Sequence, residues 1–363
     1  MLITENINTW GWNPEWAKAF QPYITQGFVP GRVTSEHKRL YTVQTEVGEL
    51  LAEVTGKFRF TAEEREDYPA VGDWLALTPR PEDARASIHA ILPRRSKFSR
   101  KVAGGVTDEQ IAAVNADTVL LVASMNYDFN LRRLERYLVP AWESGATPVI
   151  VLSKADLCPD AATFVAQVEA IAPGVPVFAV SVVTGEGMDR LAPYLQSGQT
   201  LTLLGSSGAG KSSLVNYLSG IEVQTVQSIR EDDSRGRHTT THRELFCLPN
   251  GALMIDTPGM REIQLWATED GLSDAFADVE TLKSSCRFAD CTHKKEPGCA
   301  VLNALGNGTL DRSRYDSYRK LESELAFIAR KEEQKQRMLD KGTKKAPAPR
   351  RVAASFNTKD AEY

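Results

Sequence analysis

The chain has 363 residues, more than one ordinary hydrophobic core holds, which predicts two or three domains. Its apolar fraction of 42%, charged fraction of 25% and net charge of −4 are typical of a soluble globular protein and give no global sign of nucleic-acid binding. No apolar run approaches the roughly 20 residues of a membrane span, and residues 1–23 lack the pattern of a secretory signal. Five cysteines, an odd number, favour a reducing cytoplasm and a cytoplasmic protein with no membrane partner.

The first two segments differ in pattern. Residues 1–25 form an extension with Trp10, Trp12 and Trp16, which we expect to pack on a neighbouring surface; a partner-binding anchor is the alternative. Residues 26–96 alternate between short apolar runs and turn residues. The predicted strands are 28–34, 39–44, 49–54, 73–78 and 87–92. Five short strands predict a small β-barrel of the OB-fold type, with an SH3-like barrel left open.

A basic segment, Arg94–Lys101, joins the barrel to the next domain. It holds five basic residues, no acidic residue and one aromatic residue, Phe98. Such a segment can follow a phosphate backbone while the aromatic ring stacks on a base. A solvated linker between domains is an equally good interpretation.

Residues 97–268 predict a central α/β domain. Residues 131–142 have helical spacing, and the predicted buried strands are 118–123, 148–152, 175–180, 200–204 and 252–255. This alternation predicts a doubly wound, mostly parallel sheet with helices on both faces.

A phosphate-binding loop follows the strand at 200–204. The segment Gly205–Ser212 fits G-x-x-x-x-G-K-[ST], and a helix follows it. Backbone N–H groups of such a loop cradle phosphates, Lys211 reaches the β- and γ-phosphates, and the Ser212 hydroxyl ligates Mg²⁺. The alternative is a glycine-rich structural turn. The predicted phosphate-binding residues are Gly205, Ser206, Ser207, Gly208, Ala209, Gly210, Lys211, Ser212 and Ser213.

A base-reading segment, Ser153-Lys154-Ala155-Asp156, follows the strand at 148–152. The Asp156 carboxylate can accept both N1–H and N2–H₂ of guanine, and Lys154 can lay its stem along the base. The usual pattern is Asn-Lys-x-Asp, and Ser153 is too short to reach N7 of the base as the amide does. A surface turn that starts a helix is the alternative.

A second base-side segment begins at Ser181, after the strand at 175–180. The backbone around Val182 and Val183 is expected to donate to O6 of guanine. Together with Asp156, this segment favours GTP over ATP as the ligand.

The order of these motifs is rotated. Asp256-Thr-Pro-Gly259 supplies a metal-side aspartate and a γ-phosphate-side glycine after the P-loop. The segments at Ser153 and Ser181 come before the P-loop, although they come last in an ordinary GTPase. Because all these loops lie at the carboxyl ends of parallel strands, moving the chain break leaves the site intact.

The segment 228–241 is polar and aperiodic, which suits a loop ordered by the γ-phosphate and Mg²⁺. One of the three threonines at 239–241 should complete the metal shell, with Thr240 favoured. Met260 stands where many GTPases carry a glutamine that orients water, so intrinsic hydrolysis should be slow. His238 is the expected catalytic residue beside Lys211. The alternative is a histidine that bonds a partner or its own loop.

A cysteine and histidine cluster predicts a structural zinc site. The four ligands are Cys286, Cys291, His293 and Cys299. Buried thiols, a redox pair or an iron–sulfur site are the alternatives. Cys158 and Cys247 are expected to be small buried hydrophobes.

Residues 269–335 are predicted to form a mostly helical zinc-binding domain. Its last helix should start at Thr309 or Asp311 and run to about Arg337, with one apolar face. Residues 336–363 should be a disordered basic tail, because ten Lys/Arg stand against five Asp/Glu from Arg330 onward. The tail either folds onto RNA phosphates or only aids solubility.

The permuted motifs, the segment 236–241 (Gly-Arg-His-Thr-Thr-Thr) and the distal cysteine and histidine cluster resemble the bacterial ribosome small-subunit-dependent GTPase A family over about residues 26–330. The resemblance implies an OB-fold, a circularly permuted GTPase core and one structural zinc ion. It also implies a GTP hydrolase that acts late in 30S subunit maturation. We expect this protein to bind 16S rRNA, to be stimulated by the small subunit and to act as a monomer, because nothing in the sequence suggests an obligate oligomer. The alternative function is a nucleotide-gated rRNA-binding module with negligible turnover.

Overall fold

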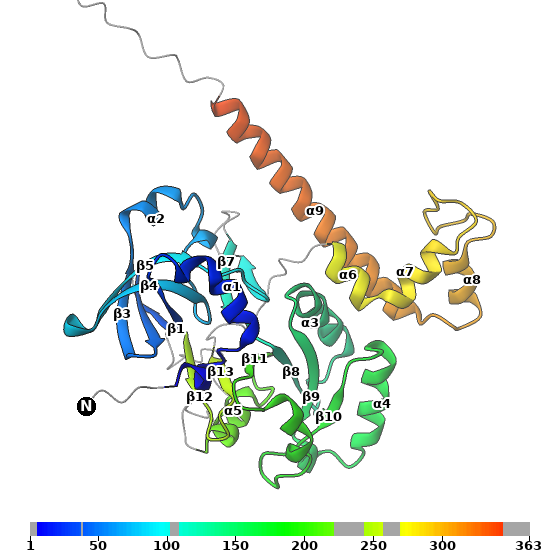
Figure 1. Cartoon of the computed structure of the whole chain (residues 1–363). Helices are drawn as coiled ribbons and strands as arrows, with labels where there is room; N and C mark the ends of the chain where they lie inside the picture. The colour runs from blue at the N-terminus through cyan, green and yellow to red at the C-terminus, as the bar shows by residue number, and fades with distance from the viewer. Residues whose placement is uncertain (1–5, 38, 102–108, 221–242, 257–268, 344–363) are drawn as a thin grey trace, which may run out of the picture. The chain divides into compact units, whose positions relative to one another are not determined.

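The computed structural model describes residues 6–37, 39–101, 109–220, 243–256 and 269–343 (Figure 1). The chain divides into two compact units, Met1–Glu322 and Ser323–Tyr363. Within the described ranges, no helix is both long enough and apolar enough to cross a membrane.

A closed five-stranded barrel forms the N-terminal part. Its strands are β1 (Val29–His37), β2 (Leu40–Thr45), β3 (Gly48–Val54), β4 (Trp74–Arg80) and β5 (Arg85–Ile91). The pairs β1–β2, β2–β3, β4–β5 and β1–β4 are antiparallel, whereas β3–β5 is parallel. The short helix α2 (Gly56–Thr61) lies between β3 and β4 in sequence. This closure is that of the OB-fold, so the OB prediction is confirmed and the SH3-like alternative is wrong.

The N-terminal extension packs on the barrel, as predicted. A 3₁₀ turn (Ile7–Trp10) leads to helix α1 (Pro14–Ile24), which Asn13 caps by accepting N–H bonds from the first turn. Trp16 and Phe20 of α1 are buried in one cluster with Trp74 of the barrel. The aromatic residues of the extension therefore belong to the core.

The basic segment forms structure instead of a free surface. Its residues enter strand β6 (Lys97–Lys101), which pairs with β7 (Glu109–Val114). Arg94 makes a bidentate bond to the carboxylate of Asp73 at 2.8 and 2.9 Å, and Arg95 stacks 3.9 Å over Trp16. Phe98 is 3% exposed. The predicted stacking of Phe98 on a base is wrong, because the ring is already buried.

The central domain is the predicted doubly wound sheet. Its parallel strands are β8 (Thr118–Ser124), β9 (Thr147–Ser153), β10 (Val177–Ala179), β11 (Thr200–Leu204) and β13 (Leu253–Asp256), in the spatial order β10-β9-β8-β11-β13. Strand β12 (Glu244–Cys247) runs antiparallel to β13 and also pairs with β1 at Ser35↔Glu244. The barrel and the central domain therefore share one continuous eleven-stranded sheet.

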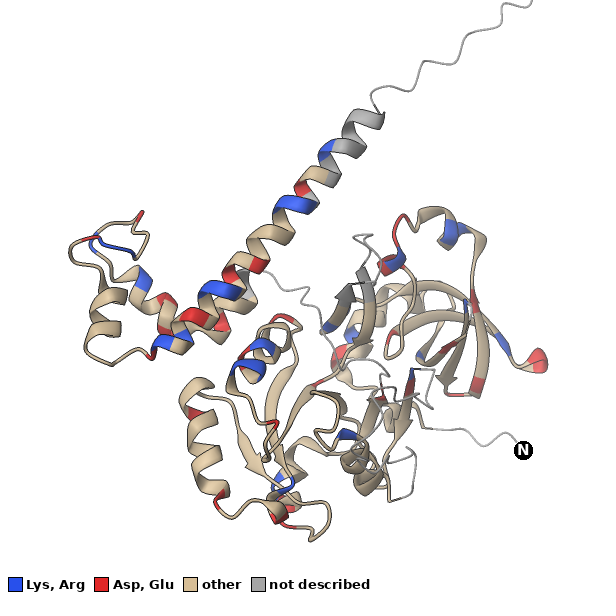
Figure 2. Ribbon diagram, turned by 180° about the vertical axis from the view of Figure 1, so that it is seen from behind, with Lys and Arg blue, Asp and Glu red and all other residues tan. Residues whose placement is uncertain are grey.

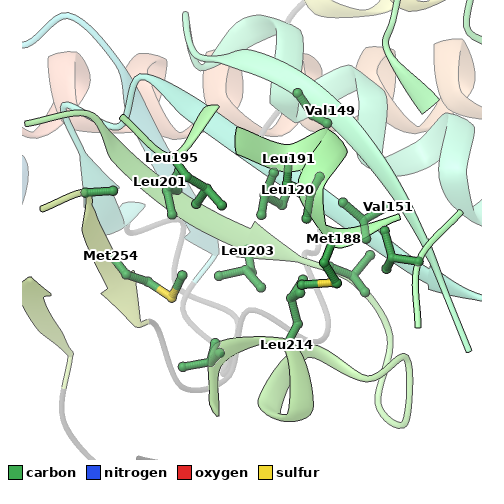
Figure 3. Packing of buried hydrophobic residues seen from close by; sticks show 14 of the residues in the cluster. Leu120, Val149, Val151, Met188, Leu191, Leu195, Leu201, Leu203, Leu214 and Met254 are labelled. Atoms are coloured by element: carbon green, nitrogen blue, oxygen red, sulfur yellow. The ribbon is translucent and has the colours of Figure 1, made fainter. Parts of the chain in front are cut away.

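Apolar side chains fill both faces of this sheet. On one face, Leu120 of β8 and Leu203 of β11 pack with Leu214 of α5 (Lys211–Ser219) (Figure 3). Side chains alternate along a strand, so Val119 and Leu121 point to the opposite face, where α3 (Leu131–Glu143) contacts β8 and β9. Helix α4 (Ala161–Ile171) contacts the edge strand β10.

The C-terminal part of the described chain is helical. Its elements are α6 (Glu269–Ala275), α7 (Ala277–Ser284), α8 (Ala300–Gly306) and α9 (Arg312–Thr343). Helix α9 continues past the predicted end near Arg337, because good helix formers run to Lys341 and the first proline comes only at 347. Charges of both signs alternate along α9 (Figure 2). The rest of the predicted tail, 344–363, lies outside the described residues.

The cysteine predictions are partly wrong. No disulfide joins the five cysteines, all of which lie in described segments. Cys158 is half-buried and Cys247 is exposed, so neither is the fully buried hydrophobe that the sequence suggested.

Candidate nucleotide and metal sites

The predicted nucleotide-binding residues gather at one edge of the sheet. Strands β9, β10, β11 and β13 are parallel, so their carboxyl ends lie on the same side. The Ser153 segment follows β9, the Ser181 segment follows β10, the P-loop follows β11 and Asp256 ends β13. This is the edge at which open α/β sheets bind ligands.

The P-loop conformation needs its glycines. A Cβ at Gly205 would lie 2.2 Å from the carbonyl oxygen of Val122, and Gly210 has a φ of +90° immediately before α5. The Lys211 ammonium donates to the carbonyl oxygens of Gly205 at 2.6 Å and Ser206 at 2.7 Å. The lysine therefore lies across the loop, at the positive end of α5.

The base-reading segment contacts both neighbouring loops. The Ser153 hydroxyl donates to the carbonyl oxygen of Ala209 in the P-loop at 2.6 Å, and the N–H of Ala155 donates to the carbonyl oxygen of Val180 at 3.1 Å. Lys154 adopts a left-handed φ of +64°. Two residues after this turn, Asp156 is exposed at the edge of the sheet.

The Ser181 segment orients Asp156. The Ser181 hydroxyl donates to Asp156 Oδ1 at 2.6 Å, and its oxygen accepts from the N–H groups of Val183 and Thr184, both at 3.2 Å. A carboxylate oxygen has further lone pairs, so Asp156 can still accept from a base. Val183 is 80% exposed, which leaves this turn open to a ligand.

A third segment beside the P-loop was missed by the sequence analysis. Asp128, in the loop after β8, accepts from Arg133 at 2.7 and 3.1 Å and from the Ser206 hydroxyl at 3.5 Å. The hydrogen bond from Arg133, together with its charge, holds the pKa of Asp128 below the usual value. The available signal was an aspartate five residues before an arginine, across the helix cap Asn130.

The γ-phosphate side is described only in part. Asp256 is half-buried, and its backbone lies opposite that of Glu244 in the antiparallel pair of β12 and β13. Gly259, Met260, His238 and Thr240 lie outside the described residues.

The cysteine and histidine cluster assembles as predicted. His293 Nδ1 lies 3.6 Å from Cys286 Sγ and 3.4 Å from Cys299 Sγ, and these two sulfurs are 3.9 Å apart. With Cys291, all four ligand atoms lie within 4.8 Å of one another. Ligands around a tetrahedral zinc ion lie about 3.5–3.8 Å apart, given metal–ligand bonds of roughly 2.0–2.3 Å. The four side chains fit a single metal ion.

Glu296 organises the loop between the last two ligands and was not predicted. One carboxylate oxygen accepts from the N–H and hydroxyl of Thr292, and the other accepts from the N–H groups of Lys294 and Lys295 at 2.9 Å. The hydrogen bond from the Thr292 hydroxyl contributes most to lowering the pKa of Glu296, and the bonds from the backbone N–H groups lower it further. The carboxylate therefore holds the turn that carries His293.

Comparison with known proteins agrees with this geometry. The RsgA GTPase family matches residues 91–266, and a family described as 50S ribosome-binding GTPase matches residues 200–337. The small ribosomal subunit biogenesis GTPase RsgA of Opitutus terrae is 47% identical over 90% of this chain and 91% of its own length. RsgA 2 of Lactiplantibacillus plantarum is 49% identical over 83% of this chain and 84% of its own length.

Two solved structures are similar. YjeQ from Thermotoga maritima has a TM-score of 0.63 and 29% identity, over 82% of this chain and 99% of that one. YloQ, described as a circularly permuted GTPase, has a TM-score of 0.58 and 27% identity, over 82% of this chain and 95% of its own.

The P-loop after β11, the base-side loops that precede it in sequence and the shared strand edge define a circularly permuted P-loop GTPase. The protein is a GTP hydrolase. The chain belongs to the RsgA GTPase family.

Proposed function

We propose that this GTPase is a late checkpoint factor in maturation of the small ribosomal subunit, that it binds 16S rRNA, and that the 30S subunit stimulates its hydrolysis of GTP. The names of the RsgA relatives, which specify small-subunit biogenesis, support this partner. The observation that carries the GTP-dependent part of the proposal is that the P-loop and the Ser153 and Ser181 segments lie together at one edge of the sheet. We further propose that the protein acts as a cytoplasmic monomer.

Residues of the P-loop and the base-side loops would hold GTP. Backbone N–H groups of 205–213 would surround the phosphates, and Lys211 would move from the loop carbonyls to the β- and γ-phosphate oxygens. Asp156, oriented by Ser181, would accept from the N1–H and N2–H₂ of guanine. The N–H groups near Val182 would lie beside O6.

The hydrolytic step depends on the γ-phosphate side. Ser212, Thr240 and Asp256 would hold Mg²⁺, which neutralises charge on the β- and γ-phosphate oxygens. His238 would hydrogen-bond the attacking water and Gly259 would donate its N–H to the γ-phosphate. Because Met260 cannot orient water, turnover should be slow until the small subunit completes the site.

The proposed domain boundaries are 1–25, 26–96, 97–268, 269–335 and 336–363. The pairing of β1 with β12 supports a coupling between the barrel and the nucleotide site, because β12 leads through β13 to the metal-side Asp256. We infer that GTP orients the barrel and the C-terminal domain for rRNA binding and that hydrolysis releases them. Equal affinity for the 30S subunit with a GTP analogue and with GDP would contradict this coupling.

The metal of the Cys₃His cluster is proposed to be one structural Zn²⁺. Three sulfurs and one imidazole nitrogen leave no open position for catalysis, and this donor set favours zinc. Elemental analysis should find one zinc ion per chain. Cys291→Ser should lose it, whereas Cys158→Ser, which changes a cysteine outside the cluster, should retain it. A full zinc content in the Cys291 variant would contradict the assignment.

The decisive experiment is steady-state GTP turnover by the protein alone, with 30S subunits and with 50S subunits. We expect at least a tenfold stimulation by 30S subunits only, because the missing water-orienting group must come from the partner. Lys211→Ala should abolish turnover in every condition. Tight GTP binding with no stimulation would support the alternative of a nucleotide-gated rRNA-binding module. Equal stimulation by 50S subunits would contradict the choice of partner.

A further inference from the structure

Ser153 ends β9 and occupies the first position of the base-reading segment. The residue is only 6% exposed and lies between two loops. The hydroxyl donates to the carbonyl oxygen of Ala209 at 2.6 Å, while the carbonyl oxygen of Ala123 lies at 3.4 Å. Ser153 therefore ties the base-reading segment to the P-loop.

A hydroxyl group has a single proton to donate. At 2.6 Å the Ala209 carbonyl is the better acceptor, and the Ala123 carbonyl is the next nearest. The site is also tightly packed, because a Cβ at Gly210 would lie 3.2 Å from the Ser153 oxygen. The proton is thus used inside the protein and is not offered to a bound base.

An asparagine at this position would behave differently. Its amide carries two N–H donors, so one can hold the P-loop carbonyl while the other reaches N7 of a purine. Serine retains the first bond and lacks the second. N7 is present in both guanine and adenine, so its recognition contributes affinity for purines but no discrimination between them.

We propose that this protein binds guanine nucleotides without a hydrogen bond to N7 and that Ser153 is a positioning residue for the P-loop. The inference rests on the proposed guanine site at Asp156. It predicts that the base is read along its N1–N2 edge, where adenine offers no matching pair of donors. Loss of the N7 contact lowers affinity for all purine nucleotides equally.

The test compares the dissociation constants of GDP and 7-deaza-GDP, in which a C–H group replaces N7. For the natural protein we expect the two constants to agree within about twofold, since no hydrogen bond is lost. In Ser153→Asn the GDP constant should fall, and 7-deaza-GDP should bind roughly fivefold more weakly than GDP, the effect of one hydrogen bond. A several-fold weaker binding of 7-deaza-GDP to the natural protein would overturn the inference.

Two further variants keep the test decisive if asparagine does not fit. Ser153→Ala should raise the dissociation constants of GDP and 7-deaza-GDP by the same factor, and Ser153→Thr, which keeps the hydroxyl, should restore them. Unchanged binding by Ser153→Ala would overturn the positioning role.

The proposed guanine site is tested separately with ADP and with Asp156→Asn, which should prefer XDP. If the natural protein bound ADP and GDP with equal affinity, the proposed guanine specificity would be wrong.

Discussion

The GTPase core contacts the N-terminal barrel and the C-terminal helical segment through different kinds of interaction. On the barrel side, β1 pairs with β12, and buried Arg32 donates to the carbonyl oxygens of Trp10 and Gly72 and to the hydroxyl of Thr200. On the other side, helix α3 meets the C-terminal helical segment (269–322) through carboxylates and guanidinium groups. The first junction combines backbone pairing, one enclosed cation and a half-exposed ion pair of Lys97 with Glu66 at 3.0 Å. The second adds buried ion pairs to the close packing of α6 on α3.

The charged junction centres on Glu135 of α3. Its carboxylate is buried and accepts from Arg132 and, at 2.9 Å, from Arg314 of α9. Arg314 also makes a bidentate bond to Asp278 of α7, with both distances 2.7 Å, and Arg132 reaches Asp311 at 3.1 Å. Ion pairs can separate and re-form with less disruption than a shared sheet. We therefore expect GTP to change the position of the C-terminal helical segment more than that of the barrel.

The largest expected effect is at Arg314, whose side chain is only 5% exposed. Arg314→Ala would leave the buried Glu135 carboxylate without its cation from α9, which costs about 3–5 kcal/mol in buried ion pairs. Thermal unfolding and limited proteolysis of the C-terminal helical segment would measure the loss.

The matched control is Arg319→Ala, which removes an ion pair between half-exposed partners, Arg319 and Glu322, on the same helix. It should cost less than about 1 kcal/mol. Equal destabilisation by the two variants would show that burial of Glu135 does not govern this junction.

The next effect lies on the barrel side, at Gly72. This residue has a φ of +100°, and a Cβ there would lie 2.3 Å from the carbonyl oxygen of Val114. Gly72→Ala should therefore force β7 away from the barrel and lower the free energy of unfolding by about 2–4 kcal/mol. Chemical denaturation followed by tryptophan fluorescence would report it, because Trp74 and Trp16 are buried next to this junction.

Gly48 offers a control with the same backbone conformation. Its φ is +99°, but nothing lies within 4 Å of a Cβ built there. Gly48→Ala should cost only the strain of the left-handed region, about 1–2 kcal/mol. If both substitutions had the same effect, the close approach of the barrel to β7 would not be a constraint.

The sequence predicted elements that depend on local pattern. The strand at 200–204 and the assembly of the four metal ligands are as expected, because an apolar run before a P-loop and closely spaced cysteines leave few alternatives. The helix at 131–142 was predicted within one residue of its observed end at Glu143. The structure of these segments depends mainly on residues that are close to them in sequence.

Features that depend on distant partners were missed. Arg94 pairs with Asp73, 21 residues away, and Arg314 pairs with Glu135, 179 residues away, so neither ion pair could be inferred from local charge. Phe98 was placed on the surface because basic residues flank it, yet the fold buries it. Helix α1 was not predicted, although Asn13 followed by Pro14 is a signal for the start of a helix.

The smallest effect concerns acid pH and Asp278. Burial raises the pKa of this carboxyl, but the hydrogen bonds and charge of Arg314 outweigh burial, and the pKa lies below its usual value. A lowered pKa means that the ionised form is favoured in the folded state. The stabilisation is therefore complete above the unfolded pKa of about 4 and is lost as the pH falls through the lower, folded pKa.

Asp278→Asn should flatten this acid dependence and lower stability near neutral pH. Asp316→Asn, an exposed carboxylate on α9 paired with Arg312, is the matched control and should leave the slope nearly unchanged. The measurement is hydrogen exchange of the first turns of α9 between about pH 2 and 5, the range in which the carboxyl titrates, corrected for intrinsic rates. The barrel junction gives the contrast, because burial lowers the pKa of Arg32 only to about 10 and the residue stays charged throughout this range. An acid dependence of equal size in β1 would mean that ion pairs do not distinguish the two junctions.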